Sequence, residues 1–122
     1  MEVSVMDNNK VVMKLNGSIT KDRLKEFEDG VKLAAKTVQE TSQQSGKVKI
    51  LFDLSHFDGT YDSDAMSQLA WLAKTDEPFT ERTACFGGPL LTRMLVELVS
   101  GLSGRENIRY FASRDAALEW LG

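Results

Sequence analysis

The sequence predicts an α/β fold in which a mixed, mostly parallel sheet of about five strands is combined with four helices. Two observations support this prediction. Apolar residues recur with a period of two in short segments and with helical spacing in longer ones. The segments follow the order β-β-α-β-α-β-α-β-α, and strands that alternate with helices form parallel sheets through right-handed crossovers. The length of 122 residues and the 42% hydrophobic content fit one domain, residues 1–122, with one core.

The first two strands are expected to form an antiparallel hairpin. In the segment 2–7, "EVSVMD", Val3 and Val5 share one face, and the segment 10–17 follows Asn8-Asn9. Asparagine tolerates the positive φ that a tight hairpin turn requires. The outer strand of such a hairpin leaves a free sheet edge, which offers one route to a homodimer.

The middle of the chain predicts a helix, a buried strand and a polar loop. Residues 20–40 predict the helix, with Thr20 as its N-cap. Its apolar face consists of Leu24, Phe27, Val31, Ala34, Ala35 and Val38. Residues 48–54, "VKILFDL", are typical of a strand covered on both faces. The polar residues from Ser55 onward predict a loop that leads into the second helix.

The second half predicts three more helices and two more strands. The second helix ends at Pro78, and its inward face consists of Ala65, Leu69, Leu72 and Ala73. Residues 81–87 predict a strand, joined by Gly87-Gly88-Pro89 to a third helix. The apolar stripe of that helix consists of Leu91, Met94, Leu95, Leu98 and Leu102. Residues 107–111 predict the last strand. Ser113 is expected to cap a terminal helix whose inward residues are Ala117, Leu118 and Leu121.

The composition excludes several classes of partner and location. The net charge of -3 gives no electrostatic reason to expect nucleic acid or an anionic membrane as partner. No apolar run approaches the roughly 20 residues of a membrane span, and no signal peptide is visible at the N-terminus. The single cysteine, Cys85, rules out an intrachain disulfide. We therefore expect a cytoplasmic protein.

The residue types also argue against metal binding and catalysis. His56 and Cys85 are the only histidine and cysteine, so they cannot build a typical zinc site. The four carboxylates of one stretch do not follow EF-hand spacing: Asp53, Asp58, Asp62 and Asp64. No nucleophile elbow and no convergent set of acid, base and nucleophile is present. We expect neither a metal nor a cofactor, and no enzymatic activity.

The polar segment that follows the third predicted strand is the first candidate site. Asp62 or Ser63 is expected to cap the second helix, and Asp64 in its first turn suits the helix dipole. A phosphate on a Ser or Thr near this helix start would be stabilised by the same amides and dipole. The residues alone do not choose between a simple cap and a phosphorylation switch.

Two further features have both a structural and a functional interpretation. Trp71 falls off the inward stripe of its helix, so it either covers the edge of the core or marks a contact surface. The "FGGPLLTR" segment is either a tight turn with Pro89 in the first turn of the third helix or a cradle of amides for an anion.

Two segments resemble the STAS family, the anti-sigma-factor-antagonist-like domains. "ILFDLSHFDGT" is similar to the family's strand that ends in Asp-Leu-Ser, followed by an apolar pair, an Asp and small hydroxyl residues. "RMLVELVSGLSGRENIRYFASRDAALEWL" is similar to its Leu-rich helix, Ser-Gly-Leu break, short strand and Ser-capped terminal helix. The resemblance covers residues 48–121 by motif, and the element order is also the STAS order. The branch it most resembles joins STAS-like domains to small lipid-carrier folds.

The resemblance implies a bacterial, non-enzymatic regulatory module that binds a protein partner, such as an anti-sigma factor or a kinase. A kinase phosphorylates the family's acceptor Ser or Thr, and Thr60 falls on that position without gaps. With an insertion, Asp62-Ser63 takes the family's Asp-Ser place and Asp64 the acceptor position. The phospho-acceptor candidates are thus Thr60 and Ser63. The partner-binding candidates are Asp53, Ser55, Asp58, Asp62, Asp64 and Trp71.

The alternative prediction is a carrier or sensor of a small apolar ligand. The Leu- and Met-rich third helix and the aromatic residues could line a cleft. Leucine and methionine at helical spacing more often form ordinary core.

Overall fold

Five strands form one mixed sheet in the computed structural model, which describes all residues from 1 to 122. The strands lie in the order of the sequence: β1 (Glu2–Met6), β2 (Lys10–Ile19), β3 (Val48–Tyr61), β4 (Thr80–Phe86) and β5 (Ile108–Phe111). The β1–β2 pair is antiparallel and all other pairs are parallel. The predicted fold class, hairpin and order of elements are confirmed.

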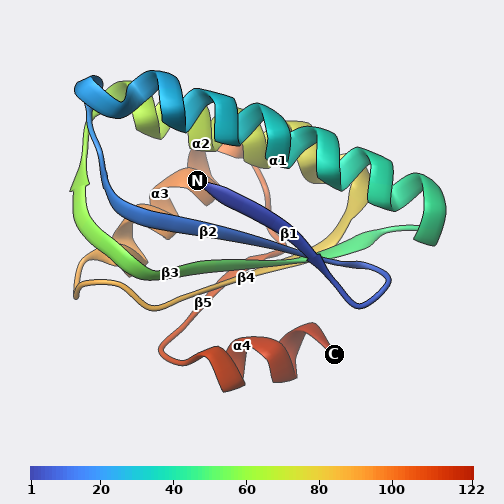
Figure 1. Cartoon of the computed structure of the whole chain (residues 1–122). Coiled ribbons are helices and arrows are strands. Elements are labelled where there is room, and N and C mark those ends of the chain that lie inside the picture. The colour runs from blue at the N-terminus through green and yellow to red at the C-terminus, as the bar shows by residue number, and fades with distance from the viewer.

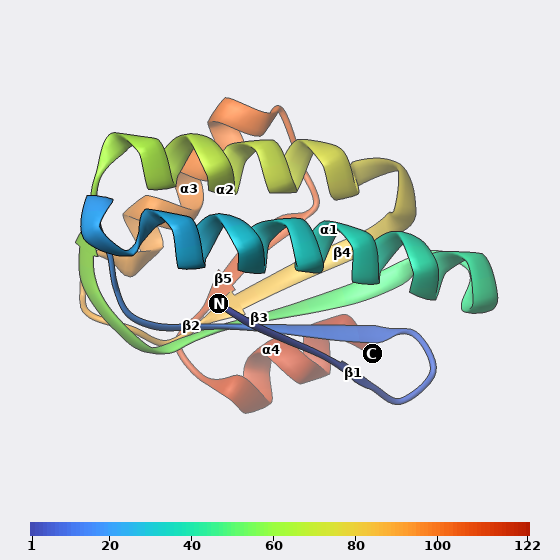
Figure 2. The same cartoon turned by 45° about the horizontal axis from the view of Figure 1, so that its top comes forward.

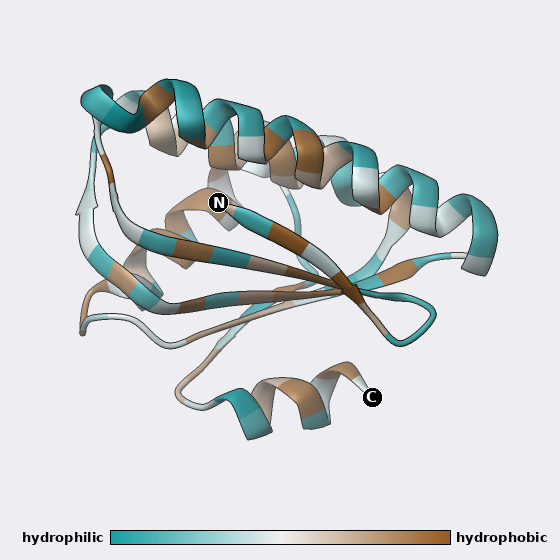
Figure 3. Ribbon diagram, in the orientation of Figure 1, coloured by the Kyte–Doolittle hydropathy of each residue, from teal (hydrophilic) through white to brown (hydrophobic).

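The helices cover the two faces of the sheet unequally. Three of them, α1 (Leu24–Ser45), α2 (Ser63–Asp76) and α3 (Thr92–Ser103), lie on one face, and α4 (Arg114–Leu121) lies alone on the other (Figures 1 and 2). Two short 3₁₀ turns, η1 (Lys21–Arg23) and η2 (Glu77–Phe79), precede α1 and follow α2. Hydrophobic residues recur along α1 between hydrophilic ones, as expected for a helix with one buried face (Figure 3).

β3 is buried from both sides over its first half, as its sequence predicts. Ile50 belongs to the large core cluster under α1, α2 and α3, whereas Leu51 belongs to the smaller cluster under α4. Both side chains are almost completely inaccessible to solvent. Because successive strand residues point to opposite faces, this strand needs apolar residues at consecutive positions.

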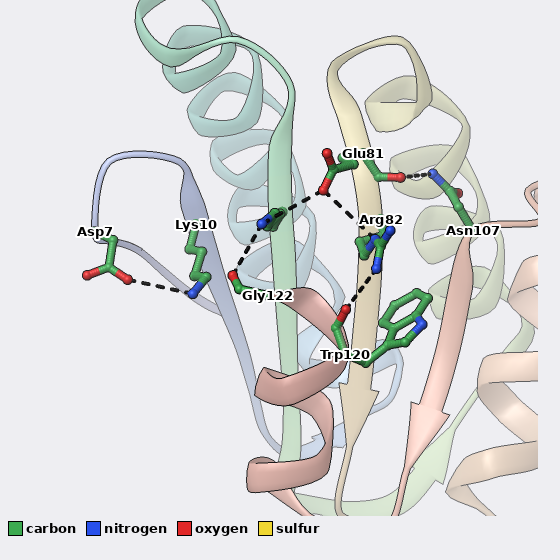
Figure 4. A network of polar contacts seen from close by, with 8 residues as sticks. Asp7, Lys10, Glu81, Arg82, Asn107, Trp120 and Gly122 are labelled. Atoms are coloured by element: carbon green, nitrogen blue, oxygen red, sulfur yellow. Dashed lines mark hydrogen bonds and ion pairs between the residues drawn. The ribbon is translucent and has the colours of Figure 1, made fainter.

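Polar contacts attach α4 to the amino-terminal ends of β3 and β4 (Figure 4). Arg82 Nη1 donates to the carbonyl oxygen of Trp120 at 2.8 Å, and the Arg82 guanidinium lies over the Trp120 ring at 5.0 Å. Lys49 Nζ lies 3.9 Å from a carboxylate oxygen of Glu81 and donates to the Gly122 carbonyl. The indole of Trp120 therefore has a structural role beneath the sheet.

Two predicted turns differ in detail from the structure. The positive φ of the hairpin lies at Asp7, with φ of 59°, rather than at Asn8 or Asn9. Aspartate also tolerates this conformation, and its carboxylate pairs with Lys10 at 3.7 Å. Thr20 caps no backbone amide of α1, because the η1 turn intervenes and the Thr20 hydroxyl instead donates to the Asp22 carboxylate.

The polar residues after Leu54 are a continuation of β3, not the predicted loop. His56, Phe57 and Tyr61 pair with β2, across two irregularities in the register. Phe57 is buried in the main core and anchors this extension. Backbone pairing to a long neighbouring strand and one buried aromatic side chain outweigh the polar composition of the segment.

The third helix buries a different stripe from the predicted one. Of the predicted stripe, Leu95 alone is buried, and Leu91, Met94, Leu98 and Leu102 are exposed. The residues that face the core are Thr92, Leu95, Val96, Val99 and Ser103. Both sets have helical spacing. The apolar side chains of α3 therefore cover more of the helix circumference than the part that packs against the core.

Two charged side chains lie inside the core at the end of α2. Asp76 and Arg105 are only 3% and 6% exposed. Arg105 is well bonded: Nη2 donates to Thr83 Oγ1 at 3.0 Å and Nε donates to Asn107 Oδ1 at 2.9 Å. Asp76 Oδ1 has no hydrogen-bond partner. Burial raises the pKa of Asp76 to about 7, although the Arg105 charge partly opposes this rise.

Asp76 should make the protein less stable as the pH rises. Between pH 4 and 7 the folded state keeps a proton on Asp76 that the unfolded chain has lost, so the free energy of unfolding falls through this window. We expect Asp76→Asn to remove a pH dependence of up to about 4 kcal/mol. Urea unfolding of both proteins at pH 4 and pH 8 measures the difference. Equal pH dependence in both would contradict the assignment.

Candidate functional site

The carboxyl ends of β3 and β4 bring a polar segment and a glycine-rich turn together. The second half of β3 lies beside the Gly87-Gly88-Pro89 turn that leads from β4 to α3. Gly87 has φ of 85°, and a Cβ atom built there would lie 2.8 Å from the Cα atom of Ser55. The Tyr110 hydroxyl donates to the Gly87 carbonyl at 2.8 Å and fixes the turn. Only glycine permits so close an approach at this φ.

The Asp53 carboxylate orients Ser55 at this edge of the sheet. Its Oδ1 accepts hydrogen bonds from the Ser55 amide at 2.9 Å and from the Ser55 hydroxyl at 2.5 Å. Asp53 itself is 9% exposed, whereas Ser55 and His56 are exposed. Asp53 is one of the predicted partner-contact residues. In the structure it orients Ser55 and has little accessible surface with which to make such a contact.

The tip of β3 presents Asp58 and Thr60 to solvent. Asp58 Oδ1 accepts a hydrogen bond from the Thr60 amide at 2.8 Å. Gly59 between them has φ of 92°, and a Cβ atom there would lie 3.2 Å from Pro89 Cγ. Thr60, the residue after Gly59, is exposed at the surface.

Asp62 is the residue that caps α2. Its Oδ1 accepts a hydrogen bond from the Ala65 amide at 3.1 Å, which leaves the Ser63 hydroxyl outside the cap. Ser63 is the first residue of the helix and is exposed, and Asp64 follows it in the first turn. A phosphate on Thr60 or Ser63 would thus add nearly two charges to a segment that already carries three carboxylates.

The turn before α3 and the outer side of α3 form an exposed apolar patch. Leu90 is 94% exposed, and the patch continues along the helix through Leu91, Met94, Leu98 and Leu102. Pro89 contacts the position of Gly59, so the patch begins beside the polar tip of β3. Exposed apolar surface with a polar rim marks interaction sites in soluble proteins.

We call this combined region the β3–α3 surface. Its polar part consists of Ser55, Asp58 and Thr60 at the end of β3, continued along the chain by Asp62, Ser63 and Asp64 at the start of α2. Its apolar part consists of Leu90, Leu91, Met94, Leu98 and Leu102. The sequence identified the polar part but assigned most of the apolar part to the core. A second set of residues with helical spacing, between Thr92 and Ser103, is also able to face the core. This second set is the sequence signal that could have indicated that the leucine- and methionine-rich stripe faces solvent.

Trp71 lies on another flank of the molecule. It is 49% exposed and lines a groove of about 280 Å³ between α1 and α2, together with Glu28, Lys32, Ser67 and Gln68. Trp71 therefore does not pack against the polar segment at the tip of β3, although the two are close in the sequence.

The Gly-Gly-Pro segment is a turn before α3 and not part of the helix. The first residue of α3 is Thr92, whose amide donates to the Pro89 carbonyl, and Leu91 provides no side-chain cap. The prediction that Pro89 lies in the first helical turn is wrong, because two turn residues intervene. No group of three or more His, Cys, Asp and Glu side chains is placed to hold a metal ion.

Comparisons with known proteins agree with this architecture. A family model described as SpoIIAA-like matches residues 11–122. The fold is similar to the anti-sigma factor antagonist SpoIIAA in its unphosphorylated form, with 12% identity, a TM-score of 0.63, and 98% and 96% of the two chains covered. It is also similar to the Bacillus cell fate determinant SpoIIAA in the phosphorylated form, with 15% identity, a TM-score of 0.61, and 99% and 98% covered.

A third similar structure is an uncharacterized protein of the DUF3478 family from Shewanella loihica PV-4, described as having a SpoIIAA-like fold. It has 14% identity and a TM-score of 0.65, and the alignment covers 99% of this chain and 91% of that one. No curated protein matches the sequence. None of the helices is both long enough and apolar enough to cross a membrane.

The contact between Gly87 and Ser55 gives a matched pair of substitutions. Gly87→Ala should lower the free energy of unfolding by roughly 2 kcal/mol or more, because the new Cβ meets backbone at a φ that disfavours alanine. Gly101→Ala, in α3 with open space around the site, should raise it by about 0.5–1 kcal/mol. Urea denaturation compares the two. Similar effects of both substitutions would show that Gly87 is not constrained.

Proposed function

This chain belongs to the SpoIIAA-like family, and from that premise we propose that it is a cytoplasmic regulatory module that binds a protein partner through the β3–α3 surface. The observation that carries the proposal is the apolar patch on α3, which lies next to exposed hydroxyl and carboxylate groups. SpoIIAA/STAS proteins are in general non-enzymatic regulators. A partner of the anti-sigma factor or kinase class fits this arrangement.

A phosphorylation switch is the mechanism we propose for control of binding. The SpoIIAA structures include an unphosphorylated and a phosphorylated form of that protein. In this chain, Thr60 and Ser63 are both exposed. Thr60 follows Gly59, whose position approaches Pro89 at the start of the apolar patch, and Ser63 opens α2 three residues later. Burying a doubly charged phosphate against a partner, in a segment that already carries Asp58, Asp62 and Asp64, is strongly unfavourable. Phosphorylation would therefore release a partner that covers this segment.

The alternative prediction, an apolar-ligand carrier, stays a prediction. The cavity beneath α2 and α3 has a volume of about 60 Å³. This is well below the roughly 300 Å³ at which pockets for drug-sized ligands begin. Carriage of a whole lipid would need a larger space than this cavity provides.

If phosphorylation controls binding, the protein should carry a phosphate, and a negative charge at the phosphorylated position should weaken partner binding. Protein purified from its own host should show a phosphate increment by intact-mass spectrometry, localised by fragmentation to Thr60 or Ser63. Thr60→Glu and Ser63→Glu should weaken capture of the partner at least tenfold and leave unfolding unchanged, whereas Thr60→Ala and Ser63→Ala should bind normally. Unchanged affinity of both Glu variants, measured by calorimetry with the recovered partner, would refute the switch.

The apolar patch can be tested separately from the switch. Leu91→Glu and Met94→Glu should abolish partner binding, because each places a charge in the dehydrated centre of the interface. Both side chains are exposed, so stability should change by no more than about 0.5 kcal/mol. Leu33→Glu is the matched control, since Leu33 is 52% exposed but lies on α1. Equal loss of binding in all three variants would argue against the β3–α3 surface.

A further inference from the structure

A small cavity lies between the sheet and the helices α2 and α3. Its volume is about 60 Å³, and twelve of its fifteen lining residues are hydrophobic. The walls come from the sheet and from both helices, for example Met13, Ile50, Leu72 and Val96. About 10–15 Å³ of such space holds one water molecule, so the cavity accepts a body of roughly four to six non-hydrogen atoms.

The polar residues of the cavity are Asp76, Thr83 and Arg105, and they are neighbours. Arg105 Nη2 donates to Thr83 Oγ1 at 3.0 Å, and the Arg105 charge acts on Asp76. All three side chains are more than nine-tenths buried. Cys85 also lines the cavity and is only 5% exposed, and this burial raises the pKa of its thiol to about 12.

Asp76 is the member of this group whose bonding is incomplete. The Arg105 guanidinium is already used, since it donates to Asn107, to Thr83 and, at 3.4 Å, to the Ala73 carbonyl. Asp76 lines the cavity, and its Oδ1 is buried and accepts no hydrogen bond. Native proteins bury few acceptors in this state, because the lost hydration is not replaced. A hydrogen-bond donor inside the cavity would satisfy this atom.

The geometry points to a binding site for a small neutral amphiphile, with a short apolar chain against the helices and one hydroxyl group that donates to Asp76 Oδ1. A neutral head group fits best because two residues of opposite charge, Asp76 and Arg105, both line the cavity. The Arg105 guanidinium repels an ammonium group, and the Asp76 carboxylate repels a carboxylate. Such a site goes beyond the proposed partner surface, which lies on the outer side of α3.

Three four-carbon probes with different head groups test the site: 1-butanol, butylamine and butyrate, the last of which counts its carboxylate carbon as the fourth. Each is titrated at pH 8 into ¹⁵N-labelled protein and followed by two-dimensional NMR. 1-Butanol should shift amides around the cavity, such as those of Leu72, Thr83 and Val96, in a saturable way. Butylamine and butyrate should bind at least tenfold more weakly. If 1-butanol causes no saturable shifts, the cavity is only a hydrated pocket in the core and the proposal is overturned.

Variants separate the cavity from general surface effects. Ala73→Leu fills the cavity from α2 and should abolish the shifts. Val99→Phe fills it from α3 and should have the same effect, so it serves as the second test if Ala73→Leu does not fold. Ala70→Leu lies on α2 outside the cavity and should bind 1-butanol normally. Asp76→Asn removes the repulsion, so butyrate should approach the affinity of 1-butanol. Binding that survives both fillers, or butyrate that equals 1-butanol in the unmodified protein, would refute the site.

Discussion

The parallel pairing of β3 with β2 is the interaction on which the rest of this structure depends. β3 is unusually long, because its polar second half continues to pair with β2 as far as Tyr61. The first half supplies both faces of the core through alternate residues such as Ile50 and Leu51. The second half carries Thr60 to the surface and delivers the chain to the Asp62 cap of α2. One strand thus joins the core to the candidate site.

Helix α3 has two apolar faces with different roles. Its inner face, with Leu95 and Val96, closes the core and the cavity beneath it. Its outer face, with Met94 and Leu98, is exposed beside the tip of β3. A helix that buried all of this apolar surface within the same chain would need a further packing partner. The exposed half is consistent with a partner supplied by another molecule.

The aspartates of this chain differ in burial and in hydrogen bonding. Asp53 and Asp62 accept hydrogen bonds from nearby amides and so stabilise a turn and a helix start. Asp76 is more deeply buried than either, and its Oδ1 has no partner. The first two follow from local geometry, whereas the burial of the third depends on α2, β4 and the segment of Arg105 meeting in space.

The sequence by itself determined the fold class, the order of the elements, the strand covered on both faces and the polar segment from Asp53 to Asp64, because hydrophobic period and capping residues are local properties. Tertiary structure decided the rest. It extended β3 through polar residues by pairing them with β2, and it chose which of two adjacent stripes of α3 faces the core. It also placed Trp71 on a separate flank and enclosed Asp76 beside Arg105. These outcomes depend on contacts between segments far apart in the chain, which no local pattern encodes.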